Sequence, residues 1–493
     1  MASRLDDLTQ QRLEKLERIK NRGIDPYPRS YERTHTAEEA KELLKNNEDT
    51  GKTSPDTISI AGRIMAIRKM GKSSFLDLQD GSGKIQIIFT NTVLGDEASA
   101  ELYKDLDIGD FIGVKGGLMR TRTGEPTIHV EKFVLLSKSL LPLPEKYHGL
   151  QDVDARHRQR YLDLISNQEV KDTFRMRSRI IASIRNYLNT NGFLEVETPV
   201  LQPSAGGALA RPFITHHHSL DCDFYLRIAL ELHLKRLIVG GFDKVYELGR
   251  IFRNEGLSIK HNPEFTMLES YQAYADYKDV MDMLENMVSY VIKEISGNFK
   301  FNYGDNAIDF TPPWQRLDLR ETILKYSGID FLQFPDVVSL RNEMLRLNME
   351  VDPAKDRGRL IDELLSAFVE PHLIQPTILY DYPLDMSPLA KKKPGYDNIV
   401  ERFEAYVCGM ELANAFSEIN DPIDQRQRFV NQQRSRGKDE EQEVIDEDFL
   451  TAMAYGMPPT GGLGVGIDRL VMLLTNQQSI REVILFPQLR EKE

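Results

Sequence analysis

The stretch VYELGRIFRNEGLSIKHNPEFTMLESYQAYADY, residues 245–277, contains two strand-like segments joined by a strongly charged loop. The flanks of this loop are rich in the β-branched and aromatic residues that favour strands. The loop itself, FRNEGLSIKHNPEF, crowds Arg253, Glu255 and His261 where a hairpin normally carries turn residues. Surface ion pairs would explain any one of these charges. Taken as a set, they indicate a hairpin whose loop holds a charged ligand.

The strand that leaves this loop has a regular alternation of side chains. A period of two places four residues on one face of it: Phe265, Met267, Glu269 and Tyr271. Arg253 stands at the end of the incoming strand, and its planar guanidinium can donate paired hydrogen bonds to a phosphate or a carboxylate. We therefore expect an anion beside Arg253 and a flat ligand on Phe265.

A second hairpin is predicted in RFEAYVCGMELANAFSEIND, residues 402–421. If residues 408–409 form a two-residue turn, Glu404 lies opposite Ala413 and becomes a diagonal neighbour of Glu411. Two adjacent carboxylates repel each other unless a cation lies between them, and hard oxygen ligands suit Mg²⁺. An edge hairpin with outward charges is the alternative interpretation.

The same strand raises a question of parity. Asn414, Phe416 and Glu418 share one face by the period of two, but simple alternation puts them opposite Glu411. A joint site would require a β-bulge near residues 412–413. The sequence pattern does not indicate such a bulge.

A third cluster is GGLGVGIDRLVMLL, residues 461–474. Its alternating glycines permit close approach of the backbone, and the segment from residue 467 onward predicts a helix with an apolar stripe. Arg469 lies in the first helical turn, where an anion is favoured. No Gly-Lys-Ser/Thr follows, so this is not a P-loop, and glycines alone are weak evidence.

Composition limits the class of protein. With 493 residues the chain is too long for one compact core, and two or three domains are expected. The absence of a long apolar run or a signal-like start predicts no membrane segment. Two cysteines, Cys222 and Cys408, indicate a reducing cytoplasm. A net charge of −13 argues against an overall basic coat but permits a local basic path for nucleic acid.

The order of elements predicts an α+β protein. Residues 5–22 predict an amphipathic helix within an N-terminal helical extension, 1–56. Short strands with Gly-rich turns predict an OB-fold β-barrel over 57–145, followed by a hinge at 146–151. The remainder, 152–493, predicts an antiparallel sheet flanked by helices.

The barrel segment SSFLDLQDGSGKIQIIF, residues 73–89, predicts a hairpin register. Its turn pairs Asp77 with Gln86 and Phe75 with Ile88, and its aliphatic residues then face the barrel core. Phe75 stays on the polar face beside Gln86. That pair suits stacking of an unpaired base and hydrogen bonding to its edge.

The run THHHSLDCD, residues 215–223, suggests a zinc site through its histidines and Cys222. Consecutive residues of a strand point to opposite faces, so adjacent histidines rarely converge on one metal. A structural role is the favoured interpretation.

Three segments together resemble the signature motifs of class II aminoacyl-tRNA synthetases, in the correct order. GFLEVETPVL (192–201) is similar to motif 1, FRNEGLSIKHNPEF to motif 2 and GLGVGIDRLVML to motif 3. A barrel ahead of the catalytic part is typical of the aspartyl, asparaginyl and lysyl subgroup. GGALARPFITHHHSLD (206–221) and ELANAFSEINDP (411–422) resemble the lysyl branch in its bacterial form. The resemblance covers essentially the whole chain.

This resemblance implies a ligase that joins L-lysine to tRNA(Lys). Lysine would react with ATP to give lysyl-adenylate and pyrophosphate, and the lysyl group would pass to the 3′-terminal adenosine of the tRNA. The resemblance further implies bound Mg²⁺, a homodimer and a cytoplasmic location.

The resemblance also assigns roles to individual residues. Catalysis would depend on Arg253 at the α-phosphate. ATP would be bound by Arg253, Glu255, His261, Phe265 and Arg469. Lysine would be bound by Gly207, Glu231, Glu269, Tyr271, Asn414, Phe416 and Glu418. Mg²⁺ would be held by Glu404 and Glu411. The anticodon would be read by Phe75, Gln86 and Glu125, and Pro199 would lie at the dimer interface.

The charges of the expected pocket discriminate between rival functions. Glu231, Glu269 and Glu418 suit a ligand with two cationic groups, whereas an aspartate-using relative should present cations. A paralogue that lysylates a protein would resemble the catalytic part alone. A catalytically silent RNA-binding module would not need all the motif residues.

Overall fold

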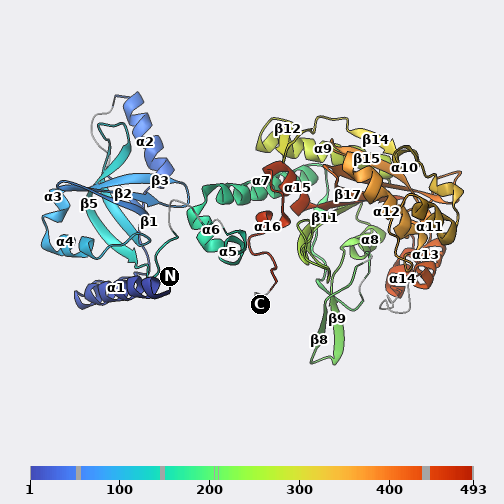
Figure 1. Ribbon diagram of the computed structural model, residues 1–493, viewed down its shortest axis with the longest axis horizontal. Helices are drawn as coiled ribbons and strands as arrows, with labels where there is room; N and C mark the ends of the chain where they lie inside the picture. The colour runs from blue at the N-terminus through green and yellow to red at the C-terminus, as the bar shows by residue number, and fades with distance from the viewer. Residues whose placement is uncertain are drawn as a thin grey trace. The chain divides into compact units, whose positions relative to one another are not determined.

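The computed structural model describes residues 2–51, 57–144, 150, 152–204, 206–208, 210–435 and 445–490. The chain forms two compact units, Met1–Leu150 and Gln151–Glu493, each with its own hydrophobic core (Figure 1). The hinge expected at 146–151 lies outside the described residues, apart from Leu150. None of the helices in the described segments is long and apolar enough to span a membrane.

The first unit is built on a five-stranded closed barrel in the order β1-β2-β3-β5-β4, as the OB-fold prediction required. Its strands are β1 (Thr57–Met70), β2 (Ser73–Gln79), β3 (Lys84–Phe89), β4 (Phe111–Arg120) and β5 (Pro126–Ser137). Its helices are α1 (Ala2–Asn21), α2 (Ala37–Asp49), α3 (Asn91–Leu94) and α4 (Glu97–Lys104).

The predicted β2–β3 register is confirmed, with Asp77 opposite Gln86 and Phe75 opposite Ile88. The Asp80 carboxylate fixes the turn by accepting hydrogen bonds from the backbone N–H groups of residues 82 and 83. The aliphatic residues expected in the core, Leu76, Leu78, Ile85 and Ile87, are at most 2% exposed.

Helix α1 agrees with the helix predicted over 5–22, whereas α2 was not expected from the sequence. Thr36 and Glu39 form a capping box at the start of α2. Ala40 and Leu44 of α2 pack into the barrel core. This apolar stripe is small and lies in a polar segment, so hydrophobic periodicity alone does not predict the helix.

The second unit contains an eight-stranded sheet in the order β14-β15-β16-β17-β18-β11-β10-β6. The strands are β6 (Leu194–Glu195), β10 (Lys244–Phe252), β11 (Glu264–Ala273), β14 (Gln315–Asp318), β15 (Thr377–Pro383), β16 (Ile399–Val407), β17 (Met410–Ser417) and β18 (Thr460–Gly466). The pairs β14–β15 and β6–β10 are parallel and the other pairs antiparallel. The predicted α+β class, with an antiparallel sheet flanked by helices, is confirmed.

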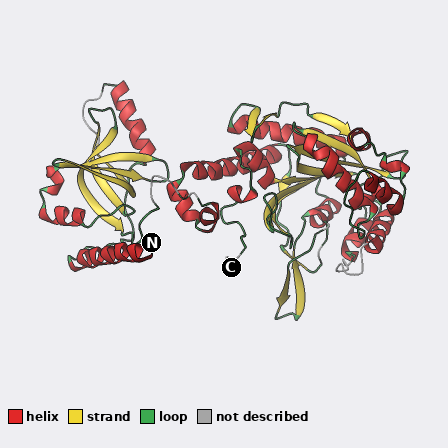
Figure 2. Ribbon diagram, in the orientation of Figure 1, coloured by secondary structure: helices red, strands yellow, loops and turns green. Residues whose placement is uncertain are grey.

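Helices cover the sheet, as Figure 2 shows. The main core is formed with α7 (Gln168–Thr190), α9 (Tyr277–Ile295) and α15 (Ile467–Thr475). The other described helices are α5 (Val153–Arg158), α6 (Arg160–Ser166), α8 (Glu231–Val239), α10 (Leu319–Ser327), α11 (Val337–Arg346), α12 (Arg357–Leu364), α13 (Pro422–Ser435), α14 (Glu447–Ala454) and α16 (Ile480–Val483). Two smaller sheets are formed by β7 (Leu201–Gln202), β8 (Ile214–His217) and β9 (Cys222–Leu226), and by β12 (Lys300–Tyr303) and β13 (Asn306–Asp309).

Because side chains alternate along a strand, the two faces of the central strands have different surroundings. Leu268, Ala413 and Ala415 belong to the core under the helices. Their neighbours Glu269 and Asn414 line a cavity on the opposite face. The sheet therefore presents one apolar face to its helices and one polar face to a ligand.

Candidate active site

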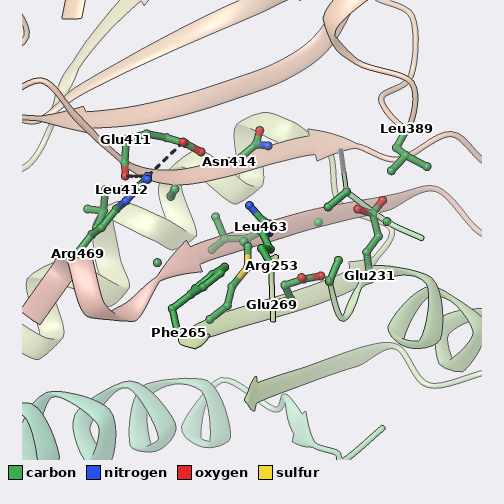
Figure 3. Close-up of a pocket in the computed structure, with 18 of the residues that line it drawn as sticks. Glu231, Arg253, Phe265, Glu269, Leu389, Glu411, Leu412, Asn414, Leu463 and Arg469 are labelled. Atoms are coloured by element: carbon green, nitrogen blue, oxygen red, sulfur yellow. Dashed lines mark hydrogen bonds and ion pairs between the residues drawn. The ribbon is translucent and has the colours of Figure 1, made fainter. Parts of the chain in front are cut away.

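A cavity of about 440 Å³ opens on the polar face of the central strands. It is lined by the β10–β11 loop together with residues of α8, β11, β17, β18 and α15. Twelve of the residues predicted to bind ATP, lysine or Mg²⁺ line it: Gly207, Glu231, Arg253, Glu255, His261, Phe265, Glu269, Tyr271, Glu411, Asn414, Phe416 and Arg469. Figure 3 shows Glu411 and Arg469 towards one end, Glu231 towards the other, and Arg253 and Phe265 between them.

The β10–β11 hairpin places Arg253 over an aromatic ring. Phe252 pairs with Glu264 across the hairpin, and the N–H of Arg253 donates to the carbonyl of Pro263 at 2.8 Å. The guanidinium carbon of Arg253 lies 5.2 Å from the ring centroid of Phe265. Burial lowers the pKa of Arg253, and the hydrogen bond that its side chain makes among the described residues is a long one, to the carbonyl of Ile228 at 3.4 Å. Such a desolvated cation favours an anionic ligand.

His261 and Arg469 form a second group of hydrogen-bond donors at the loop. Arg469 Nη2 lies 3.5 Å from His261 Nε2, and the other imidazole nitrogen lies 2.9 Å from Ser258 Oγ. Burial, and then the charge of Arg469, lower the pKa of His261. Glu255 is exposed on the same loop. A phosphate chain would find donors on both sides here.

The β16–β17 hairpin contains the β-bulge that alternation could not reveal. The predicted turn is present, with positive φ at both Cys408 and Gly409, which is the geometry of a type I′ turn. The expected pairing of Glu404 with Ala413 is wrong, because the register shifts and Glu404 pairs with Asn414. The extra residue, Leu412, reverses the parity of the strand. Asn414 and Phe416 consequently join Glu411 at the cavity.

Glu411 lines this end of the cavity, and Glu404 is a near neighbour of it that lies outside the lining. Glu404 is buried and accepts hydrogen bonds from the hydroxyls of Tyr382 at 2.8 Å and Tyr406 at 2.5 Å. It also pairs with Arg402, which was not predicted as a site residue. Partial burial, and then the charge of Glu404, raise the pKa of Glu411. A cation between the two carboxylates would relieve this repulsion.

Two carboxylates are a sufficient protein contribution for Mg²⁺ when substrate phosphates supply further ligands. The described residues contain no group of three or more His, Cys, Asp and Glu side chains arranged to hold a metal by themselves. The donor set therefore fits Mg²⁺ that is shared with a phosphate ligand, and does not resemble a closed structural metal site.

The other end of the cavity is acidic. Glu231 and Glu269 line it, whereas Glu418 is outside the lining and is joined to Glu231 through Lys235. The three carboxylates are 5%, 3% and 1% exposed. Glu269 accepts hydrogen bonds from the N–H of Leu230 at 2.9 Å and from the hydroxyl of Tyr271 at 3.0 Å. Burial, and then Glu231, raise the pKa of Glu269 to about 7. Burial raises the pKa of Glu418 to about 8, although Lys235 lowers it. Such a cluster favours a cationic ligand.

Glycines make room for these acids. A Cβ on Gly462 of β18 would lie 2.0 Å from Glu418 Oε1 and 2.6 Å from Tyr271. Gly207 has φ +87°, and a Cβ there would lie 3.4 Å from that of Glu231. The glycine pattern of 461–464, weak as evidence in the sequence, is explained by this close approach.

Lys235 is a functional candidate that reasoning from the sequence missed. Its side chain is fully buried, and its ammonium nitrogen lies 2.5 Å from both Glu231 Oε1 and Glu418 Oε2. The i,i+4 spacing of Glu231 and Lys235 on a helix was the available signal. The participation of Glu418 could not be seen without the fold.

Pro199 lies away from the cavity in an exposed apolar segment. It follows β6 and is itself exposed. Leu194, Val200 and Leu201 around it are 47%, 39% and 46% exposed. Exposed apolar side chains gathered in one segment are typical of an interaction surface.

The expected anticodon residues lie on the barrel of the first unit. Phe75 and Gln86 are half-buried diagonal neighbours on β2 and β3. Gln86 Oε1 accepts a hydrogen bond from Thr127 Oγ1 at 3.0 Å, and Glu125 is exposed immediately before β5. The barrel therefore brings the three predicted residues to neighbouring positions on its β2–β3–β5 surface.

The three histidines lie at the β8–β9 hairpin. His216 Nδ1 lies 2.9 Å from Asp223 Oδ1, and the rings of His216 and His218 contact each other. This hairpin is exposed and does not line the cavity.

Family models match both units. The model described as tRNA synthetases class II (D, K and N) matches residues 152–490. The model described as OB-fold nucleic acid binding domain matches residues 58–136. These matches correspond to the unit that holds the cavity and to the barrel.

Full-length relatives agree with the family models. A lysine–tRNA ligase of Dehalococcoides mccartyi is 64% identical over 488 residues, covering 99% of this chain and 98% of the relative. The lysine–tRNA ligase of Moorella thermoacetica is 55% identical, and the match covers 99% of this chain and 99% of the relative. That of Enterococcus faecalis is 51% identical, and the match covers 99% of this chain and 98% of the relative. By these matches and by its two-unit architecture, the chain belongs to the class II tRNA synthetases of the D, K and N group.

Proposed function

We propose that the protein activates L-lysine with ATP and transfers the lysyl group to the 3′-terminal adenosine of tRNA(Lys). The observation that carries this proposal is the placement of Glu231 and Glu269 at the opposite end of the cavity from Glu411 and Arg469, with Glu418 joined to Glu231 through Lys235. A ligand with ammonium groups fits the acidic end, and a nucleotide fits the end with cationic side chains. The names of the full-length relatives support the same assignment.

Lysine would lie with its ammonium groups among the acids. Glu231 and the backbone at Gly207 hold the α-ammonium group, while Glu269, Tyr271 and Glu418 surround the ε-ammonium group. Asn414 and Phe416 shape the wall between them. The pocket buries three carboxylates, so an amino acid with an uncharged or acidic side chain leaves these acids unpaired and is rejected.

ATP would occupy the cationic end. Phe265 stacks on the adenine and Glu255 accepts a hydrogen bond from its amino group. His261 and Arg469 bind the outer phosphates. Arg253 lies between the two substrates, close to the α-phosphate and the lysine carboxylate.

The first chemical step is an in-line attack by the lysine carboxylate on the α-phosphate, which releases pyrophosphate. No protein nucleophile is required, because positioning of both substrates supplies most of the rate enhancement. Arg253 stabilises the negative charge that develops on the α-phosphate oxygens. In the second step a ribose hydroxyl of the terminal adenosine attacks the activated carbonyl and releases AMP.

Glu404 and Glu411 would hold Mg²⁺, which neutralises phosphate charge when bound. Arg402 and the hydroxyls of Tyr382 and Tyr406 would orient the Glu404 carboxylate. Arg469 does the same for Glu411 by donating to its carboxylate at 3.2 Å.

The two units would divide the work. Residues 57–145 bind the anticodon, with Phe75 stacking on a base, Gln86 reading its edge and Glu125 contacting a neighbouring base. Residues 152–493 carry both chemical steps, and residues 146–151 connect the two units.

The apolar segment around Pro199 forms a homodimer interface, which sedimentation of the purified protein would reveal. The proposed location is the cytoplasm, where tRNA is charged.

One experiment tests the proposal directly. ATP–pyrophosphate exchange is measured with each of the standard amino acids, and tRNA(Lys) charging is then measured with radiolabelled lysine. Exchange that depends on lysine, followed by charging, is expected. Exchange with another amino acid, or none at all with lysine, would overturn the proposal.

A further inference from the structure

The buried ammonium group of Lys235 lies between two of the acids at this end of the protein's cavity, Glu231 and Glu418. It bridges Glu231 and Glu418 at 2.5 Å each, and its side chain is 0% exposed. The Nζ atom also lies 6.0 Å from the Tyr271 ring centroid and 5.9 Å from that of Phe449. The protein has thus placed an alkylammonium of its own among the acids proposed to bind one.

The local fold explains this placement. Glu231 begins α8 and Lys235 follows one turn later, so their side chains share one face of the helix. Glu418 reaches the same point from the end of β17, and the strand β18 leaves space for it at Gly462. The ionisable groups around Lys235 come from three elements and from the end of β10: Glu231, Arg253, Glu269, Tyr271 and Glu418.

The net charge of these side chains matches the charge of a particular class of ligand. When all three acids are ionised, as pairing with ammonium groups favours, Glu231, Glu269 and Glu418 contribute three negative charges, and Lys235 returns one. Two negative charges remain, which is the number of ammonium groups on a dibasic amino acid. Arg253 then matches the carboxylate of such a ligand. Bound ligand and pocket together carry no net charge, which a buried site requires for tight binding.

The free oxygens show where the ligand would enter this network. Both carboxylate oxygens of Glu418 are buried, and among the groups that the structure describes neither has a hydrogen-bond partner; Oε2 forms the ion pair with Lys235, so Oε1 is the oxygen left free. Lys235 occupies one oxygen of Glu231 and one of Glu418, and leaves the second oxygen of each. Burial alone would lower the pKa of Lys235, but the charges of Glu231 and Glu418 raise it, so the ammonium stays protonated.

We infer that Lys235 is a specificity-determining positioning residue, an internal counter-ion that bridges Glu231 and Glu418 and favours their ionised forms, so that the pocket accepts an amino acid with two ammonium groups. The inference rests on the proposed function. Lys235 touches neither reacting atom and acts through the two carboxylates.

The test compares wild-type protein with Lys235→Met and Lys235→Gln in lysine-dependent ATP–pyrophosphate exchange between pH 6 and 9. Both variants should raise the KM for lysine by at least about tenfold at neutral pH and leave the KM for ATP unchanged. Without the cation, one carboxylate takes up a proton that lysine must displace. The pH above which the KM for lysine stops falling should therefore rise by about one unit or more.

Lys138 offers a matched control in the barrel. It is also 0% exposed and bridges two carboxylates, those of Asp107 and Asp110, at 2.6 and 2.7 Å. Lys138→Met should lower the melting temperature but leave the lysine KM and its pH dependence as in the wild type. This control separates the loss of a buried ion pair from the loss of this particular one.

A double variant covers the case in which the single variants do not fold. Lys235→Met with Glu231→Gln removes one charge of each sign, so the net charge of the pocket is kept. The KM for lysine should rise because Glu231 is itself a proposed ligand of lysine, but the pH above which this KM stops falling should lie near that of the wild type. A plateau displaced as far as that expected for Lys235→Met alone would overturn the inference.

The remaining outcomes also discriminate. Folded Lys235 variants with a wild-type lysine KM and plateau would overturn the role of Lys235 and leave the proposed function standing. Absence of lysine-dependent exchange in the wild-type protein would refute the proposed function itself.

Discussion

Arg253 carries its charge into the middle of the cavity, with the Phe265 ring beneath it. We expect Arg253→Ala to lower the rate of ATP–pyrophosphate exchange by roughly 10²–10³-fold or more, because charge on the α-phosphate loses its stabilising partner. The fold should persist, since the side chain makes one long hydrogen bond among the described residues, to the carbonyl of Ile228 at 3.4 Å. Exchange kinetics and circular dichroism measure the two effects.

The control for this prediction is Arg250→Ala on the same strand. Arg250 is exposed and lies 3.5 Å from Glu264, outside the cavity lining. This variant should retain wild-type exchange. Near-normal exchange in Arg253→Ala would remove Arg253 from the reaction.

Glu269 links substrate binding to stability through its pKa of about 7, above the ordinary 4.5. The folded protein holds this proton more tightly than the unfolded chain, so the free energy of unfolding falls as pH rises from about 4.5 to 7 and stays low above. At pH 8, Glu269→Gln should therefore increase the free energy of unfolding by on the order of 2–3 kcal/mol, and so raise the melting temperature. At pH 5 it should have little effect.

The same substitution should abolish measurable lysine binding, because a neutral amide replaces a carboxylate beside the ε-ammonium. In the wild type, the KM for lysine should rise as pH falls below about 7, where Glu269 becomes protonated. Thermal melts and exchange assays at both pH values check this pair of effects. Equal stabilisation at pH 5 and pH 8 would contradict the linkage.

At the scale of an element, the glycines of β18 leave space that neighbouring side chains occupy. Gly462→Ala would bring a methyl group to 2.0 Å from Glu418 Oε1 and 2.6 Å from Tyr271. The carboxylate must move, so the KM for lysine should rise by about tenfold or more, which corresponds to roughly 1.4 kcal/mol of lost binding. Exchange kinetics with varied lysine and with varied ATP measure it.

Gly466→Ala is the matched control at the end of the same strand. Its Cβ would meet only Arg469 at 3.5 Å, an ordinary contact. The KM for lysine should stay within about twofold of the wild type. If Gly462→Ala also left that constant unchanged, Glu418 would not contact lysine.

Much of these elements was predictable because alternation and turn chemistry are local. The β10–β11 and β16–β17 hairpins, the barrel register and the face shared by Phe265 and Glu269 follow from side-chain period and short turns. The bulge at Leu412 was not predictable, because it depends on how β17 meets both of its neighbours. No residue type in that segment demands it.

Some features were not predicted from the sequence, for two different reasons. The Thr36–Glu39 capping box of α2 was a readable signal that went unused. Lys235 and Arg402 depend on partners that only the fold supplies. Glu418, one of the partners of Lys235, lies 183 residues further along the chain.

At the scale of the whole molecule, two separate cores allow base recognition and chemistry to be tested apart. Phe75→Ala should weaken tRNA charging by about 5- to 150-fold, since stacking of a base on an aromatic ring contributes roughly 1–3 kcal/mol. ATP–pyrophosphate exchange should be unchanged, because that reaction needs no tRNA. Both rates are measured on the same preparation.

Val134→Ala provides the comparison within the barrel. Val134 is 44% exposed on β5, so its loss tests surface truncation away from the Phe75–Gln86 pair. Charging should stay at the wild-type level. Equal losses of charging and exchange in Phe75→Ala would instead indicate damage that spreads beyond the barrel.

The single extra residue at Leu412 has a consequence for how this protein can evolve. It sets which side chains between the Cys408–Gly409 turn and Glu418 point to the substrates, so deleting or adding one residue there would exchange the two faces of the strand. Substitutions alter one contact at a time, whereas a change of length inverts them all. Across relatives, this segment should therefore vary in composition far more readily than in length.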